Sequence, residues 1–204
     1  MRWRSWKNSY QDKAGIEMTS YCDYCNSHPE EIYNKNYHDR EYGFPLKKDN
    51  LLFERLMLEI NQAGLSWITI LKKKENFHLA YDGFDVETVA GYEAKDRARL
   101  LTDAGIIRNR LKINAAIENA RRIQLLQVEY GSFKNWLDQN HPLSLEEWAK
   151  LFKKTFLFTG GEIVREFLVS TGYLPGAHDA DCPIFEVVKR KNPPWMRSLK
   201  PGAR

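Results

Sequence analysis

The chain carries, at residues 56–74, the sequence LMLEINQAGLSWITILKKK. Apolar residues recur at helical spacing on both sides of residues 62–66, so this stretch predicts two helices joined by a tight break. Glu59 lies in the first helix among apolar neighbours, where a carboxylate is costly to bury without a partner. Leu65 lies within the break and Trp67 follows it, although surface turns are usually polar. A buried acid beside an apolar turn indicates a functional site; the alternative is a half-exposed Glu59 beside two core residues.

Helical periodicity extends over most of the 204 residues, and no segment shows convincing strand alternation. The longest expected helix runs from Asn109 to about Tyr130, after a glycine-containing hairpin at residues 103–109. Asp49 and Ser66 are the expected N-caps of the two helices that flank the break. The sequence therefore predicts an all-α fold with an irregular N-terminal segment and an irregular C-terminal tail.

Charge is distributed unevenly along the chain. Residues 1–13 contribute +3 and residues 189–204 contribute +6 to a net charge of +4, so the remaining residues carry −5. We therefore expect a flexible N-terminal extension at residues 1–20, one domain at residues 21–188 and a basic tail at residues 189–204. No apolar run is long enough to span a membrane and no signal-peptide pattern is present, so a cytoplasmic protein is expected.

Cysteine and histidine residues gather near both ends of the expected domain. Cys22, Cys25 and His38 lie near its start. His178 and Cys182 form an H-x3-C pair near its end, a spacing at which both side chains reach one ion. Zinc takes four tetrahedral ligands of these types, so two of the first three residues would complete a structural site that stabilises two irregular segments. The alternative is a set of unrelated buried thiols and exposed histidines.

The hairpin and several aromatic residues are further candidates for ligand contacts. A helix, a turn and a second helix direct backbone N–H groups at a phosphate, and nearby cations add charge. The candidate cations are Arg108, Arg110 and Lys112. The candidate rings for stacking on a flat or cationic ligand are Tyr33, Tyr37 and Trp67. The alternatives are a plain helix connection and aromatic residues that fill a core.

Five motifs follow one another between residues 22 and 182. They are Tyr37-His-Asp-Arg-Glu-Tyr-Gly43, Leu58-Glu-Ile-Asn-Gln-Ala-Gly-Leu-Ser-Trp67, Asp103-Ala-Gly-Ile-Ile-Arg108, Phe156-Leu-Phe-Thr-Gly160 and His178-x3-Cys182. In this order they resemble the motifs of the bacterial DNA-3-methyladenine glycosylase I family of the helix-hairpin-helix superfamily. The QAGLSW block is the most specific of them. The resemblance implies a helix-hairpin-helix glycosylase fold with a zinc site that ties the N- and C-terminal segments.

The resemblance implies an enzyme that flips 3-methyladenine out of double-stranded DNA and hydrolyses its N-glycosidic bond. Glu59 matches the glutamate that contacts the flipped base, and the pocket aromatics match Tyr33, Tyr37 and Trp67. The Gly64-Leu65 turn matches the wedge that fills the gap in the base stack. The DNA-binding residues of the matching hairpin are Gly105, Arg108, Arg110 and Lys112. No lysine stands at an obvious nucleophile position, so a monofunctional enzyme is expected, acting as a monomer and leaving an abasic site.

The same resemblance implies which residues bind zinc. They are one N-terminal cysteine with His38, His178 and Cys182. Cys22 is favoured because Cys22-Asp-Tyr24 reproduces the family's Cys-x-aromatic pattern, whereas Cys25 keeps the family's distance to the histidine. We therefore predict a structural zinc site made of Cys22, His38, His178 and Cys182.

The chemistry of the implied substrate agrees with these residues. Methylation at N3 makes adenine cationic, so the base is already a good leaving group and needs stacking faces and a complementary carboxylate more than a strong acid. Each cation–π contact contributes about 0.5–2 kcal/mol. Glu59 would read the base edge or activate the attacking water, and both roles stay open.

Three parts of the sequence depart from the family pattern. Tyr42 replaces a common tryptophan, Ile60-Asn61 replaces a small residue, and Glu162 adds a carboxylate near the expected pocket. Ile60-Asn61 and Glu162 make a glycosylase with altered lesion specificity one alternative. Two others are a non-catalytic sensor of alkylated or abasic DNA and a zinc-stapled helical interaction domain.

Overall fold

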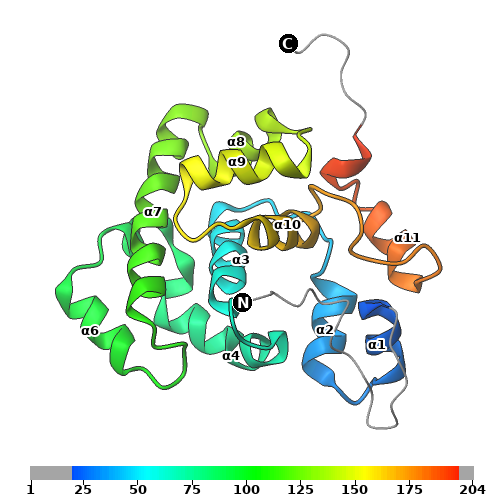
Figure 1. The fold of residues 1–204 in the computed structure, drawn as a ribbon, viewed down its shortest axis with the longest axis horizontal. Helices are drawn as coiled ribbons and strands as arrows, with labels where there is room; N and C mark the ends of the chain where they lie inside the picture. The colour runs from blue at the N-terminus through cyan, green and yellow to red at the C-terminus, as the bar shows by residue number, and fades with distance from the viewer. Residues whose placement is uncertain (1–19, 198–204) are drawn as a thin grey trace. The chain divides into compact units, whose positions relative to one another are not determined.

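The computed structural model describes residues 20–197, and every regular element in that range is helical, which confirms the all-α prediction (Figure 1). The chain forms two compact units. Unit 1 combines the residues up to Pro45 with those from Leu168 onward, and unit 2 comprises residues 46–167. The expected N-terminal extension, apart from residue 20, and the last seven residues of the expected tail lie outside the described range. No helix within that range is long and apolar enough to cross a lipid bilayer.

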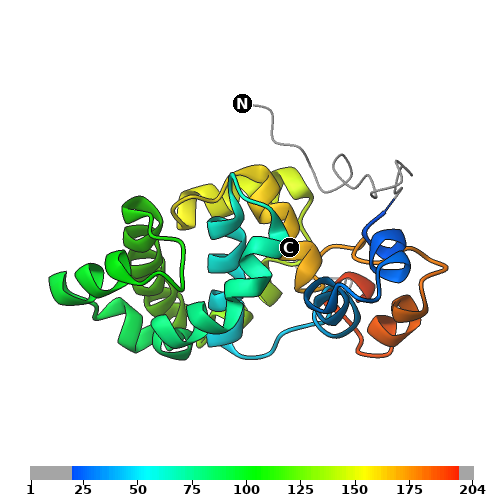
Figure 2. The same cartoon turned by 90° about the horizontal axis from the view of Figure 1, so that it is seen from below.

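Unit 2 is built around α3. Its elements are α3 (Asp49–Gln62), α4 (Trp67–Ala80), η2 (Asp82–Phe84), α5 (Val86–Ala90), α6 (Ala94–Thr102), α7 (Arg110–Tyr130), α8 (Phe133–Asn140), α9 (Leu145–Thr155) and most of α10 (Gly161–Ser170). Helix α3 packs against α4, α5, α7 and α8, and every residue from Leu52 to Asn61 is buried. Figure 2 shows α3 and the long α7 from below. A helix enclosed on several sides can carry a polar residue such as Glu59 deep inside the unit.

The helix boundaries on either side of the predicted hairpin follow from capping. The side chain of Asn109 accepts hydrogen bonds from the backbone N–H groups of Leu111 and Lys112, at 3.0 and 3.2 Å. Helix α7 therefore begins at the predicted place. Gly131 ends α7 with φ 82°, a left-handed conformation that glycine adopts without strain.

Asp49 is not the N-cap of α3 that the sequence predicted. The N-cap of α3 is Lys48, and Asp49 is the first residue of the helix. Its carboxylate accepts hydrogen bonds from the backbone N–H groups of Phe133 and Lys134, at 2.9 and 3.0 Å. Asp49 thus satisfies the first turn of α8, a long-range role that local spacing did not indicate.

Unit 1 joins the early and late parts of the chain. Its elements are α1 (Tyr21–Ser27), α2 (Ile32–Arg40), the end of α10, α11 (Pro183–Lys189) and η3 (Pro194–Met196). The backbone N–H of Gly43 donates to the carbonyl of Ser170 at 2.9 Å. Gly43 has φ 81°, and a Cβ atom there would lie 2.6 Å from the Cβ atom of Ala177. Glycine at this position permits the close approach of the two segments.

Candidate functional site

Glu59 is enclosed within unit 2, which rules out the half-exposed alternative. Only 2% of its surface is exposed, and its Oε2 atom has no hydrogen-bond partner among the described residues. Burial, reinforced by the carboxyl group of Glu166 and opposed by Arg55, raises the pKa of Glu59 from 4.5 to about 8. The carboxyl therefore keeps its proton at neutral pH. A buried acid with a free oxygen and a strongly raised pKa is typical of a functional site.

Glu166 on α10 is a functional candidate that the sequence did not reveal. Its side chain is buried and forms an ion pair with the neighbouring Arg165. Glu162, the carboxylate that the sequence singled out, is exposed one helical turn earlier. The sequence did contain one indication that Glu166 is buried: it precedes Phe167 on the apolar side of α10. The additional acid that acts on Glu59 is therefore Glu166 and not Glu162.

The break after α3 is a tight turn that ends at Leu65. The backbone N–H of Leu65 donates to the carbonyl of Gln62 at 2.7 Å. Ala63 has φ −49° and ψ 114°, and Gly64 has φ 84°, which are the dihedral angles of a type II turn. The Leu65 side chain is 40% exposed, whereas Trp67, at the start of α4, is buried. Leu65 is therefore a surface residue on a defined turn and does not fill the core.

The hairpin at residues 103–109 is held by polar contacts. The Asp103 side chain accepts a hydrogen bond from the backbone N–H of Gly105 at 2.7 Å. Lys73 of α4 donates to the carbonyls of residues 104 and 105, at 2.8 and 3.2 Å. Arg108 and Arg110 are exposed on the second half of the hairpin and the start of α7. The structure therefore offers two exposed cations beside an ordered turn.

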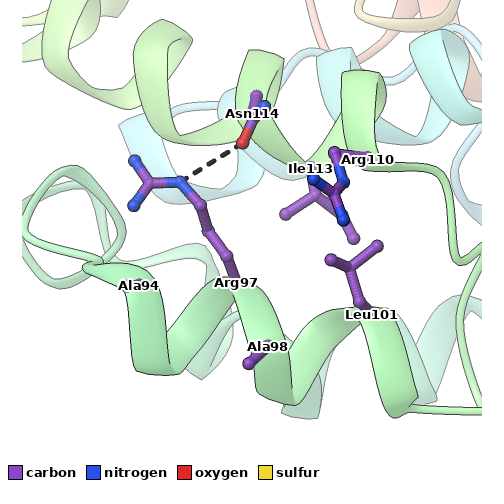
Figure 3. A pocket seen from close by; sticks show the side chains of 7 residues that line it. All are labelled: Ala94, Arg97, Ala98, Leu101, Arg110, Ile113 and Asn114. Atoms are coloured by element: carbon purple, nitrogen blue, oxygen red, sulfur yellow. Dashed lines mark hydrogen bonds between the residues drawn. The ribbon is translucent and has the colours of Figure 1, made fainter.

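A groove of about 370 Å³ lies between α6 and α7, beside the hairpin (Figure 3). Its lining residues are Ala94, Arg97, Ala98, Leu101, Arg110, Ile113 and Asn114. The Nε atom of Arg97 donates to the Oδ1 atom of Asn114 at 3.2 Å, the bond drawn in Figure 3. Two arginines and no carboxylate line this groove. Glu59 does not line it, so the groove and the buried acid are separate features of unit 2.

Lys112 lies in different surroundings from Arg108 and Arg110. Only 8% of its surface is exposed, and its Nζ atom donates to the carbonyls of Asn61 and Ala63, both at 2.9 Å. Burial lowers its pKa. Lys112 thus connects α7 to the turn after α3 through these two hydrogen bonds. The sequence had suggested instead that its ammonium contacts a DNA phosphate.

Four side chains in unit 1 form a cluster that is able to hold a metal ion. The ligand atoms of Cys22, His38, His178 and Cys182 lie within 4.8 Å of one another, and all four residues are buried. The Nε2 atom of His38 lies 3.2 Å from Nδ1 of His178, 3.2 Å from Sγ of Cys22 and 3.7 Å from Sγ of Cys182. A tetrahedral ion with bonds of about 2.0 Å to nitrogen and 2.3 Å to sulfur separates its ligands by roughly 3.3–3.8 Å. The cluster has that size.

The groups around the cluster fix the orientation of both imidazoles. The Nδ1 atom of His38 lies 2.7 Å from Oδ1 of Asp39, and the Nε2 atom of His178 lies 2.8 Å from the carbonyl oxygen of Tyr42. Such contacts set the tautomer and leave the other nitrogen free to bind a metal. Burial lowers the pKa of His178 to about 4, so its imidazole is neutral. Cys25 is also buried but does not belong to the cluster, so the cluster contains Cys22, the cysteine that the sequence favours, and not Cys25.

The aromatic candidates lie in different environments. Tyr33 and Tyr37 are one turn apart on α2, and Tyr33 is 52% exposed whereas Tyr37 is buried. The rings of Tyr37 and Tyr42 pack with their centroids 5.6 Å apart. Trp67 is buried in unit 2. Tyr33 alone of the three predicted residues therefore presents a largely exposed ring.

Two curated proteins are similar to this chain over most of their length. It is 53% identical over 165 residues to DNA-3-methyladenine glycosylase 1 of Escherichia coli, covering 72% of this chain and 88% of that protein. It is 34% identical over 185 residues to the DNA-3-methyladenine glycosylase of Haemophilus influenzae, covering 81% of this chain and 98% of that protein.

Solved structures and a family sequence model agree with this similarity. The 3-methyladenine DNA glycosylase I of Staphylococcus aureus superimposes with a TM-score of 0.72 at 33% identity, covering 81% of this chain and 97% of that one. A 3-methyladenine DNA glycosylase I in complex with 3-methyladenine gives 0.69 at 34% identity, covering 74% and 91%. The model of the methyladenine glycosylase family matches residues 25–146. The resemblance inferred from the motifs is thus confirmed, and this chain belongs to the methyladenine glycosylase family.

Proposed function

We propose that this protein is a monofunctional DNA glycosylase that releases 3-methyladenine, or a related N3-alkylated purine, from double-stranded DNA by hydrolysis and leaves an abasic site. Family membership and the named relatives support the reaction class. The observation that carries the proposal is the buried Glu59 carboxyl with an unpartnered oxygen, one turn before the Leu65 turn. The protein acts as a cytoplasmic monomer in this proposal.

The raised pKa of Glu59 supports a preference of the proposed site for a cationic base. A protonated carboxyl loses its proton when a positive charge arrives beside it, because an opposite charge lowers the pKa of the acid. An N3-methylated adenine supplies that charge, and unmodified adenine does not. The resulting carboxylate pairs with the base edge or accepts a proton from the attacking water. In this proposal the site therefore binds the damaged, cationic base more tightly than unmodified adenine.

Extrusion of the base uses the features around the turn and the hairpin. Flipping a base costs a few kcal/mol, and less for a damaged base. Leu65 fills the vacated space in the stack, as apolar wedges do. The hairpin, with Gly105, Arg108 and Arg110, holds the backbone phosphates. Trp67 is the proposed aromatic face for the base in unit 2, and Tyr33 and Tyr37 on α2 stay candidates for stacking that substitution tests.

The metal in unit 1 is zinc in this proposal, with Cys22, His38, His178 and Cys182 as ligands. Two thiolates and two imidazoles in a tetrahedral arrangement are a preferred zinc ligand set. Four side-chain ligands leave no open position for water, so the metal stabilises unit 1 and takes no part in base hydrolysis.

The decisive experiment measures free base release from duplex DNA that carries single N3-, N7- or O6-alkylated purines. We expect the purified protein to release 3-methyladenine and to leave undamaged DNA intact. Binding to alkylated DNA without any base release identifies a non-catalytic sensor and overturns the proposal. Faster release of another adduct identifies altered lesion specificity, the second candidate, which the buried Glu166 beside Glu59 favours. The interaction-domain alternative predicts no salt-dependent duplex binding.

A further inference from the structure

We propose that Lys112 is a positioning residue for base extrusion, an inference that rests on the proposed glycosylase function. Its ammonium fixes the turn that presents Leu65 and ties this turn to the helix that leaves the hairpin. The contacts are its two hydrogen bonds to the carbonyls of Asn61 and Ala63, both 2.9 Å long. Lys112 acts through the turn and does not touch the base.

The bond to Ala63 selects one orientation of the peptide at the centre of the turn. Type I and type II turns differ mainly by a half rotation of this central peptide, which reverses the direction of its carbonyl. In the observed type II turn, the Ala63 carbonyl points at the Lys112 ammonium. A flipped peptide would lose that bond and leave a buried cation without one of its acceptors, which is unfavourable. The lysine therefore favours a single conformation of the residues that carry the wedge.

The bond to Asn61 adds a second constraint at the end of α3. The last carbonyls of a helix have no partner within it, and a cation there is favoured by the helix dipole. Asn61 lies two residues after Glu59, so Lys112 also holds the end of the helix that carries the buried acid. One side chain thus restrains both the acid-bearing helix and the turn.

The position of Lys112 in the sequence relates this restraint to the hairpin. Lys112 lies in the first turn of α7, and its backbone N–H is bonded to the side chain of Asn109, the last residue of the hairpin. Lys73 acts on the other half of the hairpin, through the carbonyls of residues 104 and 105. Substitution of Lys73 and of Lys112 should therefore have different effects. Lys73 orders the hairpin alone, and Lys112 joins the hairpin helix to the wedge.

The test compares Lys112→Met with Lys73→Met, because methionine keeps most of the aliphatic length of lysine and removes the ammonium. Each variant is measured for single-turnover release of 3-methyladenine and for affinity toward an abasic-analogue duplex and an undamaged duplex. Extrusion is followed by the fluorescence of 2-aminopurine placed beside the lesion, and the melting temperature monitors folding.

For Lys112→Met we expect base release and abasic-duplex affinity to fall by about ten- to a hundredfold, because a displaced site group has an effect of that size. Undamaged-duplex affinity should change less than about twofold. Lys73→Met should weaken binding to both duplexes equally. Combined with Leu65→Ala, Lys112→Met should add little further loss, since both substitutions act on the same wedge.

Three outcomes would overturn the proposal. One is full additivity of the Lys112 and Leu65 substitutions. Another is an equal loss of affinity for both duplexes with a smaller salt dependence, which marks a direct phosphate contact. The third is unchanged release. If Lys112→Met does not fold, Lys112→Arg serves, because its guanidinium keeps the charge but changes the geometry of both bonds. If the unmodified protein releases no base, the proposed function fails, whereas the 2-aminopurine signal still tests Lys112.

Discussion

The cluster in unit 1 and the acid in unit 2 bury polar groups in opposite ways. Cys22, His38, His178 and Cys182 face one another, and the outer nitrogen of each imidazole has its own partner. Glu59 is equally buried, but one carboxyl oxygen has no hydrogen-bond partner within the described residues. The four side chains of the cluster lie close enough to bind one ion together, whereas one oxygen of the acid has no partner among the described residues. Polar groups that all have partners are typical of structural sites. A buried polar group that lacks a partner is typical of a site that binds a charged ligand.

Removing the acid tests this contrast most strongly. Glu59→Gln should lower single-turnover release of 3-methyladenine by about 10²–10⁴-fold, the range of a lost general base. Affinity for an abasic-analogue duplex should be retained, because the wedge and hairpin are intact. A variant that keeps the rate of the unmodified protein would show that the carboxyl is dispensable.

The cluster should instead respond in stability and metal content. Cys22→Ala should remove one equivalent of zinc, measured by mass spectrometry, and destabilise the protein by about 3 kcal/mol, lowering the melting temperature by roughly 10 °C. Cys25→Ala is the matched control, since it removes a buried thiol outside the cluster. It should keep the zinc and lower the melting temperature by only a few degrees, about what a small cavity costs. Zinc loss in the Cys25 variant alone would reverse the ligand assignment.

Glu59 should also make stability depend on pH. Its pKa is about 8 in the folded protein and 4.5 ordinarily, so the folded state binds the proton more tightly. Its unfavourable effect is absent below pH 4.5, grows as the pH rises toward 8 and is constant above that. Glu59→Gln should therefore be more stable than the unmodified protein by up to about 5 kcal/mol at pH 9, and about equally stable at pH 4. Chemical denaturation at both pH values measures the difference, and a pH-independent difference would contradict the raised pKa.

Glu166 should produce the smallest effect. Because its carboxyl raises the pKa of Glu59, Glu166→Gln should move the rising limb of the kcat/KM profile for base release to lower pH. Glu162→Gln is the matched control on the exposed face of the same helix and should leave the profile in place. Equal shifts in both variants would indicate a general charge effect and no specific coupling.

The sequence predicted those parts of the molecule that depend on local pattern. Helical spacing gave the helices around the break, and Asn109 marked the start of α7 because capping needs only neighbouring residues. Glu59 and the H-x3-C pair were chosen as candidates because their residue types are unusual in those settings, and their functional roles stay predictions.

The parts that escaped prediction depend on contacts between distant residues. Lys112 has the same charge as its exposed neighbours, and only the fold shows that its ammonium reaches the end of α3. Glu166 was overlooked in favour of Glu162 because the buried side of α10 is set by its neighbours. Spacing favoured one cysteine and local pattern the other, and only the three-dimensional cluster separates Cys22 from Cys25.

The discontinuous course of unit 1 has a consequence for the synthesis of the protein. Unit 2 is one continuous stretch and can fold while translation continues, since domains generally fold as units as they emerge. Cys22 and His38 leave the ribosome early but lack their partners until residues 178–182 are made. During that interval the thiol and the imidazole are open to oxidants and competing ions. The four residues of the cluster can therefore meet only after unit 2 has been made, so unit 1 is the last part of the chain to be completed.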